Sequence, residues 1–338
     1  MTNVGIIGSG YWGINHVRTF NALNNCDLKG VADLSPANLE RVKGISADIR
    51  TTDDYRRILD DKDIDAVVIA TDAESHFKLA SEAMDAGKHV LVEKPLALTV
   101  ADGENLVRRA EDSGLVLMVG HILLYHPAVA KMKEFISTGE LGDVYYLFTQ
   151  RVNLGKVRAT ENALWSLAPH DISIMLYLVG DEPQEVSASG RSYVQDGIED
   201  VVFFWLRFPG AMMAHGHVSW LDPHKIRKLT VVGSKKMAVF DDVDSTEKVR
   251  LYNKGVESSP ATYGSYGESI SIRHGDVNIP YVKMVEPLRA ECLHFIECVE
   301  KGATPLTDGR DGLRVLKVLE AAQRSLKGGG APVGTAED

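Results

Sequence analysis

The chain has 338 residues, of which 44% are hydrophobic, and a formal net charge of -10 at pH 7. This length allows two domains with separate cores, and the acidic balance argues against nucleic acid or an anionic membrane as the main partner. The first apolar strand begins too early to leave room for a signal peptide, and no apolar run approaches the ~20 residues that span a bilayer, so we expect a cytoplasmic protein. The three cysteines lack the spacing of a disulfide framework or a zinc ribbon, which predicts reduced thiols.

Apolar segments alternate with amphipathic ones over the first 120 residues. The apolar segments are residues 4–7, 28–32, 66–70, 89–92 and 115–119. Near-continuous apolar strands separated by helices are typical of a parallel sheet that is covered on both faces. Ser75 and Thr99 are predicted to cap helices at their N-termini, and Gly87 and Gly114 to end them. We therefore predict an α/β protein whose N-terminal domain, residues 1–120, is a doubly wound Rossmann domain.

A glycine-rich turn follows the first strand directly. Its residues are Gly8, Ser9, Gly10, Tyr11, Trp12 and Gly13, and a helical pattern comes next. The first glycine permits the tight turn, the second lets the backbone approach a pyrophosphate, and the third lets the helix pack against the strand. Because the helix N-terminus then faces the phosphates with unpaired N–H groups, this segment predicts a dinucleotide site.

Asp33 ends the second strand and is followed by Leu34 rather than by an arginine. A carboxylate at this position accepts hydrogen bonds from the ribose hydroxyls and repels a 2′-phosphate, so NAD is predicted as the cofactor in preference to NADP. As an alternative, Asp33 caps the helix that begins near Pro36. Ser35 already offers the capping hydroxyl there.

After residue 120 the pattern changes to period-two segments. A helix is predicted at 127–138, and strands are predicted at 144–152, 185–194, 201–208, 212–218, 228–232 and 237–240. They indicate a large open, mainly antiparallel sheet, with one face covered by a helix after His170 and by helices at 288–299 and 313–326. The second domain, residues 121–338, is therefore predicted to be α+β, to bind substrate and to form a homo-oligomer (dimer or tetramer) through the free sheet face. The Gly-rich tail from about residue 328 is expected to be flexible.

Glu93, Lys94 and Pro95 stand directly after an apolar strand of the parallel sheet. Ligands of open α/β sheets bind beyond the carboxyl ends of the strands, so Lys94 is predicted to reach the cofactor and Pro95 to stop the strand. Oxidation of an alcohol needs a base for the hydroxyl proton, and a lysine can supply it when burial under the nicotinamide disfavours the ammonium form. Glu93 is expected to point to the other side of the strand. The alternative is an ordinary solvated lysine at a strand end.

A second candidate group lies in the segment from Asn162 to Ile172. We predict that a helix opens here with Pro169 in its first turn, which puts His170 near the helix start. A helix N-terminus disfavours the imidazolium form, which suits a neutral His170 that hydrogen-bonds a substrate hydroxyl. The alternative is a histidine that satisfies backbone groups of the first turn.

Other polar residues give weaker signals. His215 and His217 share one face of a strand and His224 follows in a loop, but no cysteine or suitably spaced acid completes a zinc site, so no metal is predicted. Four arginines are candidates for a phosphate contact and otherwise ordinary surface residues: Arg151, Arg158, Arg227 and Arg273.

These motifs, taken in order, resemble those of the Gfo/Idh/MocA oxidoreductase family along nearly the whole chain. The resemblance is carried by Gly8 to Gly13, by Ala70, Thr71 and His76, by Glu93 to Pro95, and by Ser166 to His170. It implies that Lys94 and His170 form the catalytic pair. Members of the family commonly have an aspartate four residues before the histidine, where this chain has Ser166.

More narrowly, the chain is similar to the nucleotide-sugar branch of this family. The similarity is carried by Gly10 to Gly13, by Gly120, His121 and Tyr125, and by residues 151–155, 164–171, 217–223 and 232–237. It implies NAD-dependent oxidation of C3 of UDP-N-acetylglucosamine or of its uronic acid. A separate enzyme would then aminate the 3-keto sugar for lipid A or another surface polysaccharide.

The resemblance also implies which residues contact each ligand. The NAD contacts are expected at Gly8, Ser9, Gly10, Tyr11, Trp12, Gly13, Asp33, Thr71, His76, Glu93, Lys94 and Trp165, with Trp165 on the nicotinamide and Ser9, Tyr11 and Trp12 at the pyrophosphate. The UDP-sugar contacts are expected at Lys94, Tyr125, Arg158, Asn162 and His170. Two kinds of alternative stay open: another sugar or polyol dehydrogenase or a dTDP-3-keto-sugar reductase, and, from another class, an NAD-sensing binding protein without turnover.

Overall fold

The computed structural model describes residues 1–155, 157–258 and 270–335. The chain divides into two compact units. The first unit comprises residues 1–125 and 285–320, and the second comprises residues 126–284 and those after 320. The sequence analysis assigned everything after residue 120 to the second domain. In the structure, however, the chain returns to the first unit at residue 285.

The first unit contains a six-stranded parallel sheet in the order β3-β2-β1-β4-β5-β6. Its strands are β1 (Thr2–Ile7), β2 (Cys26–Ala32), β3 (Arg50–Thr52), β4 (Ala66–Ile69), β5 (His89–Glu93) and β6 (Leu117–Gly120). This is the strand order of the doubly wound dinucleotide-binding fold, so the predicted fold class is confirmed. β3 is not among the predicted strands, because it is three polar residues long and carries no apolar signal.

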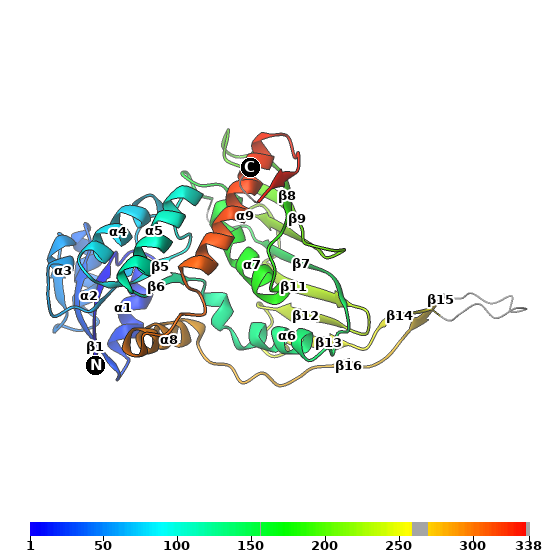
Figure 1. The fold of residues 1–338 in the computed structure, drawn as a ribbon, viewed down its shortest axis with the longest axis horizontal. Helices are drawn as coiled ribbons and strands as arrows, with labels where there is room; N and C mark the ends of the chain where they lie inside the picture. Colours follow the sequence, from blue (N-terminus) through cyan, green and yellow to red (C-terminus); the bar gives the residue numbers. More distant parts are fainter. Residues whose placement is uncertain (156, 259–269, 336–338) are drawn as a thin grey trace, which may run out of the picture. The chain divides into compact units, whose positions relative to one another are not determined.

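Helices cover both faces of this sheet (Figure 1). They are α1 (Gly13–Asn21), α2 (Pro36–Lys43), α3 (Arg56–Leu59), η1 (Ala73–Ser75), α4 (His76–Asp85), α5 (Val100–Ser113), η2 (Ile122–Tyr125), α8 (Pro287–Lys301) and the start of α9 (Gly309–Lys327). On one face, α1 and α8 share a buried core through Val17, Phe20 and Phe295. On the other face, α4 and α5 pack on the strands through Leu79 and Leu106.

The helix ends match the sequence expectations in part. Thr99 caps α5, because its hydroxyl accepts a hydrogen bond from the Asp102 N–H at 3.1 Å, and Gly114 ends the helix in the left-handed conformation at φ +66°. Ser35 and Ser75 occupy the N-cap positions of α2 and α4, as predicted, but neither side chain makes a capping hydrogen bond. The Ser75 hydroxyl instead donates to the Asp72 carbonyl oxygen.

The second unit is built on a nine-stranded sheet in the order β16-β13-β12-β11-β7-β10-β9-β8-β17. Its strands are β7 (Val144–Val152), β8 (Glu185–Arg191), β9 (Val201–Arg207), β10 (Met213–Ser219), β11 (Ile226–Gly233), β12 (Met237–Asp241), β13 (Val249–Tyr252), β16 (Val277–Asn278) and β17 (Val333–Gly334). Neighbouring strands are antiparallel except for β7 and β10, which are parallel. A separate hairpin joins β14 (Gly255–Ser258) and β15 (Ile270–Arg273).

Two helices of this unit are α6 (Pro127–Ser137) and α7 (Ala163–Val179). α7 packs on β7, β9 and β10, as predicted for the helix around His170. α8 packs on α1 in the first unit, so the expectation that it would cover this sheet is wrong. The tail after residue 328, predicted to be flexible, contains β17, whose Val333 pairs with Val186 of β8.

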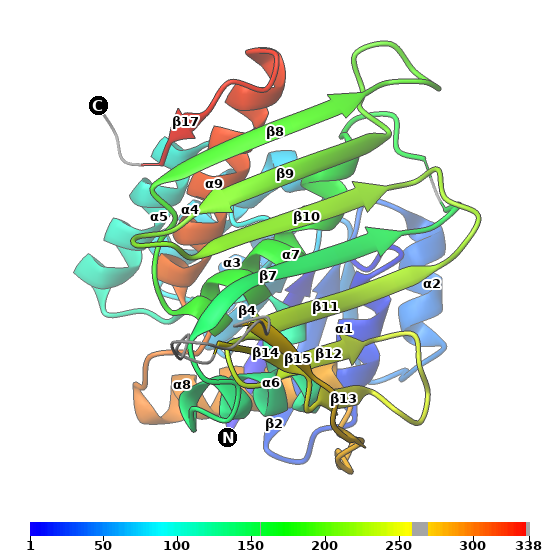
Figure 2. The ribbon, with the colours of Figure 1, turned by 90° about the vertical axis from the view of Figure 1, so that its right-hand side faces the viewer.

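One face of the nine-stranded sheet carries exposed apolar side chains. Figure 2 shows its strands from β8 to β12 side by side. Phe203 and Trp205 on β9 are exposed, and His217 on the neighbouring β10 stacks on Phe203 with ring centres 4.2 Å apart. His215, which is also on β10, stacks on Phe148 with ring centres 5.0 Å apart. Both imidazoles therefore belong to an aromatic surface.

Metal-binding clusters and membrane-spanning helices are both absent from the described part of the chain. Within residues 1–155, 157–258 and 270–335, no three histidine, cysteine or acidic side chains gather closely enough to ligate a metal ion. Over the same residues, no helix combines the length and the apolar composition needed to cross a bilayer.

Candidate functional site

The glycine-rich turn after β1 gives each of its three glycines the environment that the motif predicts. A Cβ on Gly8 would lie 2.6 Å from the Ala70 carbonyl oxygen, and one on Gly13 would lie 2.2 Å from the Gly8 carbonyl oxygen. Gly8 also has a positive φ of +91°. A Cβ on Gly10, by contrast, would meet nothing within 4 Å. The turn is thus closed on its protein side and open at Gly10, where a pyrophosphate would approach the backbone, so these residues fit a dinucleotide.

Asp33 holds this turn in place from the end of β2. One carboxylate oxygen accepts hydrogen bonds from the Ser9 N–H at 2.6 Å and the Ser9 hydroxyl at 3.0 Å. The other accepts from the Ser35 N–H at 2.8 Å and the Asn38 amide at 3.1 Å. Burial acts to raise the pKa of Asp33, but these hydrogen bonds outweigh it and hold the pKa below its ordinary value. The carboxylate is therefore ionised at neutral pH, and its charge would repel a 2′-phosphate.

The expected cofactor residues Thr71 and His76 follow β4. Thr71 packs against Gly8, and its hydroxyl lies 2.7 Å from the Ser75 hydroxyl. His76 is buried, with Nδ1 2.7 Å from the Pro95 carbonyl oxygen and Nε2 3.2 Å from the Thr71 carbonyl oxygen. Its imidazole thus joins the turn after β4 to the turn after β5 from inside the protein. Burial lowers the pKa of His76, although both carbonyl groups act in the opposite direction.

Lys94 follows the last residue of β5, and Pro95 ends the strand as predicted. Lys94 is half-buried. The Glu93 carboxylate turns towards α1, where it lies 2.5 Å from the Trp12 indole nitrogen and 2.7 Å from Nε2 of His16. Burial acts to raise the pKa of Glu93, but His16, the charge of Lys94 and the Trp12 N–H outweigh it, so the pKa lies below its ordinary value. The Gly-rich turn and the lysine-bearing turn are therefore joined through one carboxylate.

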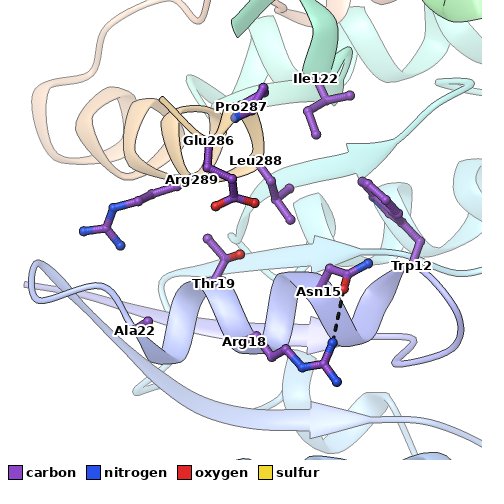
Figure 3. Close-up of a pocket in the computed structure, with 10 residues that line it drawn as sticks. All are labelled: Trp12, Asn15, Arg18, Thr19, Ala22, Ile122, Glu286, Pro287, Leu288 and Arg289. Atoms are coloured by element: carbon purple, nitrogen blue, oxygen red, sulfur yellow. Dashed lines mark hydrogen bonds between the residues drawn. The ribbon is translucent and has the colours of Figure 1, made fainter. Parts of the chain in front are cut away.

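The two aromatic residues of the Gly-rich turn are exposed, Tyr11 to 89% and Trp12 to 37%. A pocket of about 500 Å³ lies beside α1, and Trp12 borders it at one end (Figure 3). The other side chains around it are Asn15, Arg18, Thr19, Ala22, Ile122, Glu286, Pro287, Leu288 and Arg289. These residues come from α1, η2 and the start of α8, and they include neither Lys94 nor Asp33.

In the second unit, α7 carries the other expected site residues, but it begins earlier than predicted. Asn162 is its N-cap and accepts a hydrogen bond from the Trp165 N–H at 3.1 Å. Pro169 and His170 therefore lie inside the helix, about two turns from its start, and the argument from the helix N-terminus does not apply to His170. His170 is half-buried, and Ser166 stands four residues earlier on the same face.

Asn162 and Trp165 are held by one glutamine of α9. The Asn162 amide donates to Gln323 at 3.0 Å and to Glu199 at 2.6 Å. The Trp165 indole N–H donates to Gln323 at 3.0 Å. Gln323 is not among the residues predicted from the sequence, because a single glutamine in an amphipathic helix carries no signal of its own.

Arg151, a candidate for a phosphate contact, is instead buried and forms a bidentate ion pair with Asp171. Its Nε lies 2.6 Å from one oxygen of Asp171, and Nη2 lies 3.1 Å from the other. Asp171 follows His170 directly in α7, so this pair fixes the helix to β7. Burial raises the pKa of Asp171, although Arg151 opposes the shift.

The remaining candidate substrate and phosphate residues belong to different units. Tyr125 is in the first unit, where its hydroxyl oxygen lies 3.3 Å from the Thr307 hydroxyl oxygen and burial raises its pKa. Arg158 is exposed in the second unit, with Nε 3.5 Å from Glu161. In the same unit Arg227 pairs with Asp242 at 3.4 Å, and Arg273 donates to Asn253 at 3.0 Å.

Known proteins resemble this chain over nearly its full length. UDP-N-acetylglucosamine 3-dehydrogenase from Acidithiobacillus ferrooxidans is 28% identical, with 92% of this chain and 93% of that protein covered. Its solved structure gives a TM-score of 0.79 and covers 97% of this chain and 98% of its own. Myo-inositol 2-dehydrogenase from Thermotoga maritima is 25% identical, with 96% of each covered.

A third relative is the NAD-dependent scyllo-inositol 2-dehydrogenase from Bacillus subtilis, which is 26% identical, with 96% of this chain and 94% of that protein covered. Residues 2–121 match an oxidoreductase family with an NAD-binding Rossmann fold, and residues 129–239 match the Gfo/Idh/MocA C-terminal domain. The chain therefore belongs to the Gfo/Idh/MocA family of NAD-binding oxidoreductases.

Proposed function

We propose that this protein oxidises the C3 hydroxyl of a UDP-N-acetylhexosamine, UDP-N-acetylglucosamine or its uronic acid, to the 3-keto sugar with NAD. The observation that carries the proposal is Lys94, half-buried directly after β5, in a chain 28% identical to a UDP-N-acetylglucosamine 3-dehydrogenase over 92% of its length. The carboxyl end of a strand in an open α/β sheet is where ligands bind. The 3-keto product would be the substrate of an amination that makes a 3-amino sugar for lipid A or a surface polysaccharide.

In this proposal each side chain has a defined task. NAD, when bound, accepts the hydride from C3. Lys94 takes the proton of the C3 hydroxyl, and His170 hydrogen-bonds that oxygen or shares the proton. Tyr125, Arg158 and Asn162 contact the UDP-sugar. Ser166 stands where the resemblance to the family implies an aspartate, and this proposal gives the proton to Lys94 and His170.

We assign the cofactor contacts as follows. Gly10, Tyr11 and Trp12 face the pyrophosphate, with Gly8 and Gly13 as the glycines that keep the turn closed and Ser9 holding it to Asp33. Asp33 accepts from the adenosine ribose. Thr71, Glu93 and His76 support the turns on either side, and Trp165 covers the nicotinamide. The ionised Asp33 favours NAD over NADP through its charge.

We further propose that two copies of the protein associate through the exposed face of the nine-stranded sheet. The support is its exposed aromatic surface, which includes Phe203, Trp205 and the stacked His215 and His217. Contiguous apolar patches of this kind mark protein interfaces. The homo-oligomer, a dimer or tetramer, would work in the cytoplasm.

The proposal is tested by incubating the purified protein with NAD and one candidate alcohol at a time, and following NADH by its absorbance. The panel contains UDP-N-acetylglucosamine, its uronic acid, a dTDP-sugar, myo-inositol and scyllo-inositol. We expect NADH formation with a UDP-N-acetylhexosamine and the loss of most of it in Lys94→Ala. Turnover of other alcohols with none on either UDP-sugar would overturn the substrate, and tight NAD binding with no reaction on any of them would favour a binding protein.

A cyclic polyol is the second candidate substrate. It is favoured by the myo-inositol 2-dehydrogenase from Thermotoga maritima, which is 25% identical over 96% of this chain. A ring hydroxyl of inositol and the C3 hydroxyl of a pyranose need the same base, so Lys94 and His170 keep their tasks in either reaction. NADH formation with myo-inositol or scyllo-inositol, and none with either UDP-sugar, would favour the polyol as substrate.

A further inference from the structure

The Glu93 carboxylate is the meeting point of three segments of the first unit. One of its oxygens accepts from the Trp12 indole N–H at 2.5 Å and faces Nε2 of His16 at 2.7 Å. The other lies 3.3 Å from the Lys94 N–H. The carboxyl group also packs against β6, since a Cβ on Gly120 would lie 3.0 Å from it. The carboxylate is therefore confined on several sides.

His16 can act here only as a hydrogen-bond donor through Nε2, because an ionised carboxylate accepts and does not donate. The other ring nitrogen of His16, Nδ1, faces the buried Cys292 thiol, whose sulfur lies 3.8 Å away. Burial raises the pKa of Cys292 well above its ordinary value, so the thiol keeps its proton and can donate it to Nδ1. A line of polar contacts thus runs from Cys292 through His16 to Glu93.

A second carboxyl group, that of Glu291, is close enough to Glu93 to respond to its charge. Glu291 on α8 is fully buried, and neither of its oxygens has a hydrogen-bond partner among the described residues. Burial and the charge of Glu93 raise its pKa well above the ordinary value, so Glu291 is neutral while Glu93 is ionised. Two neighbouring acids with opposite protonation states give the site a fixed charge at Glu93.

We propose that Glu93, held by His16, is the positioning residue of this site: its largely buried carboxylate, with a side chain 13% exposed, fixes the Trp12 indole in the Gly-rich turn and the turn that carries Lys94 in one arrangement. Trp12 needs such an anchor because more than a third of its surface is exposed, and packing alone leaves its rotamer undetermined. A charge-assisted hydrogen bond in a low-dielectric interior supplies that anchor. The role deepens the proposed NAD site but does not depend on which alcohol is oxidised.

The test compares two substitutions of His16. His16→Leu fills the space without a donor, whereas His16→Gln keeps an N–H near the position of Nε2. In the protein without NAD, the indole N–H of Trp12 gives one of four tryptophan side-chain signals in a ¹H–¹⁵N spectrum, since the chain has four tryptophans, and Trp12→Phe identifies it. We expect His16→Leu to move this signal and His16→Gln to restore it towards its wild-type position.

Two control variants separate positioning from packing. Cys292→Ala removes a side chain that contacts His16. Glu291→Gln replaces a neutral acid by a neutral amide of the same shape. We expect both to leave the Trp12 signal near its wild-type position. A signal in His16→Leu that moves no further than in Cys292→Ala, or no recovery in His16→Gln, would overturn the proposal.

Glu93→Gln provides a second route if His16→Leu does not fold. The amide keeps the shape but loses the charge, so the Trp12 signal is expected to move upfield, and the Kd for NADH, measured by titration of its fluorescence, to rise on the order of 10-fold. An unmoved signal with an unchanged Kd would overturn the positioning role. Both readouts are independent of turnover, so failure of the proposed sugar reaction and failure of this inference give different results.

Discussion

The two units hold their candidate functional residues in different ways. In the first unit the candidate cofactor turn is defined by backbone features: a closed turn at Gly8 and Gly13, an open position at Gly10 and a strand that ends at Glu93. In the second unit they are side chains on one helix, fixed by partners far away in the sequence, such as Gln323 for Asn162 and Arg151 for Asp171. A site made of backbone can be recognised from a short motif. A site made of side chains depends on packing that no short motif contains.

The largest effect is expected from the reactive group of the first unit. Lys94→Met should lower kcat by about 10²- to 10⁴-fold, the range for removal of a general base, and leave the Kd for NAD nearly unchanged, because the base acts on the substrate proton in the transition state. The measurements are steady-state kinetics with the best alcohol of the panel and a separate NADH titration.

Lys88→Met is the matched control for this variant. Lys88 is a buried lysine of the first unit, and its Nζ donates to the Asp61 and Ile64 carbonyl oxygens, each at 2.7 Å. Its loss should lower the free energy of unfolding and spare kcat. A Lys94→Met enzyme with near-normal kcat would refute the assigned base.

The next largest effect is expected in the second unit, on the free energy of unfolding. Asp171→Asn leaves the buried Arg151 guanidinium without its counter-charge, so the free energy of unfolding is expected to fall by about 3–5 kcal/mol in urea denaturation. Glu185→Gln is the control, because its two-pronged pair with Arg207 is at the surface and should contribute almost nothing. An equal decrease in the free energy of unfolding in the two variants would contradict the idea that Arg151 and Asp171 fix α7.

The sequence predicted the first unit well because its signals are local. The parallel sheet follows from alternating apolar segments, and the glycine spacing specifies a turn whose close contacts are between neighbouring parts of the chain. What it missed in this unit is non-local. His16 and Glu93 meet across 77 residues, and His16 and Cys292 across 276. Helical spacing alone puts His16 on the same buried face as Gly13 and Val17, and this is the one local signal that pointed to it.

The errors in the second unit have a common physical cause. Pro169 resembles a first-turn residue, and this moved the predicted helix start about two turns too far along the chain, although Asn162 is also a good cap. Tertiary packing decides between the two, since the longer α7 covers β7, β9 and β10. In the same way, α8 was assigned to the nearest sheet in the sequence, whereas its apolar face completes the core beside α1.

A pair of glycine variants sharpens the contrast between backbone and side-chain sites. Gly13→Ala puts a methyl group 2.2 Å from a carbonyl oxygen that cannot move freely, so the free energy of unfolding should fall by about 1–3 kcal/mol. Gly10→Ala meets open space and should leave stability unchanged, yet weaken NADH binding, because the methyl group occupies the approach of the pyrophosphate. Thermal unfolding and NADH titration separate the two. Unchanged NADH binding in Gly10→Ala would place the pyrophosphate elsewhere.

The smallest effect is expected from His76, whose imidazole joins two turns of the first unit through backbone carbonyl groups. Its pKa is lowered in the folded protein, mainly by burial, so the unfolded chain takes up a proton first as the pH falls. The stability that His76 contributes is therefore fully present above about pH 6.5, the ordinary value, and is lost as the pH falls towards the folded pKa, by at most about 1.4 kcal/mol per pH unit. His76→Gln should flatten the pH dependence of the free energy of unfolding below about pH 6.5. His224→Gln, which removes an exposed imidazole, is the control variant. A slope in His76→Gln equal to that of the wild type would contradict a lowered pKa of His76 in the folded protein.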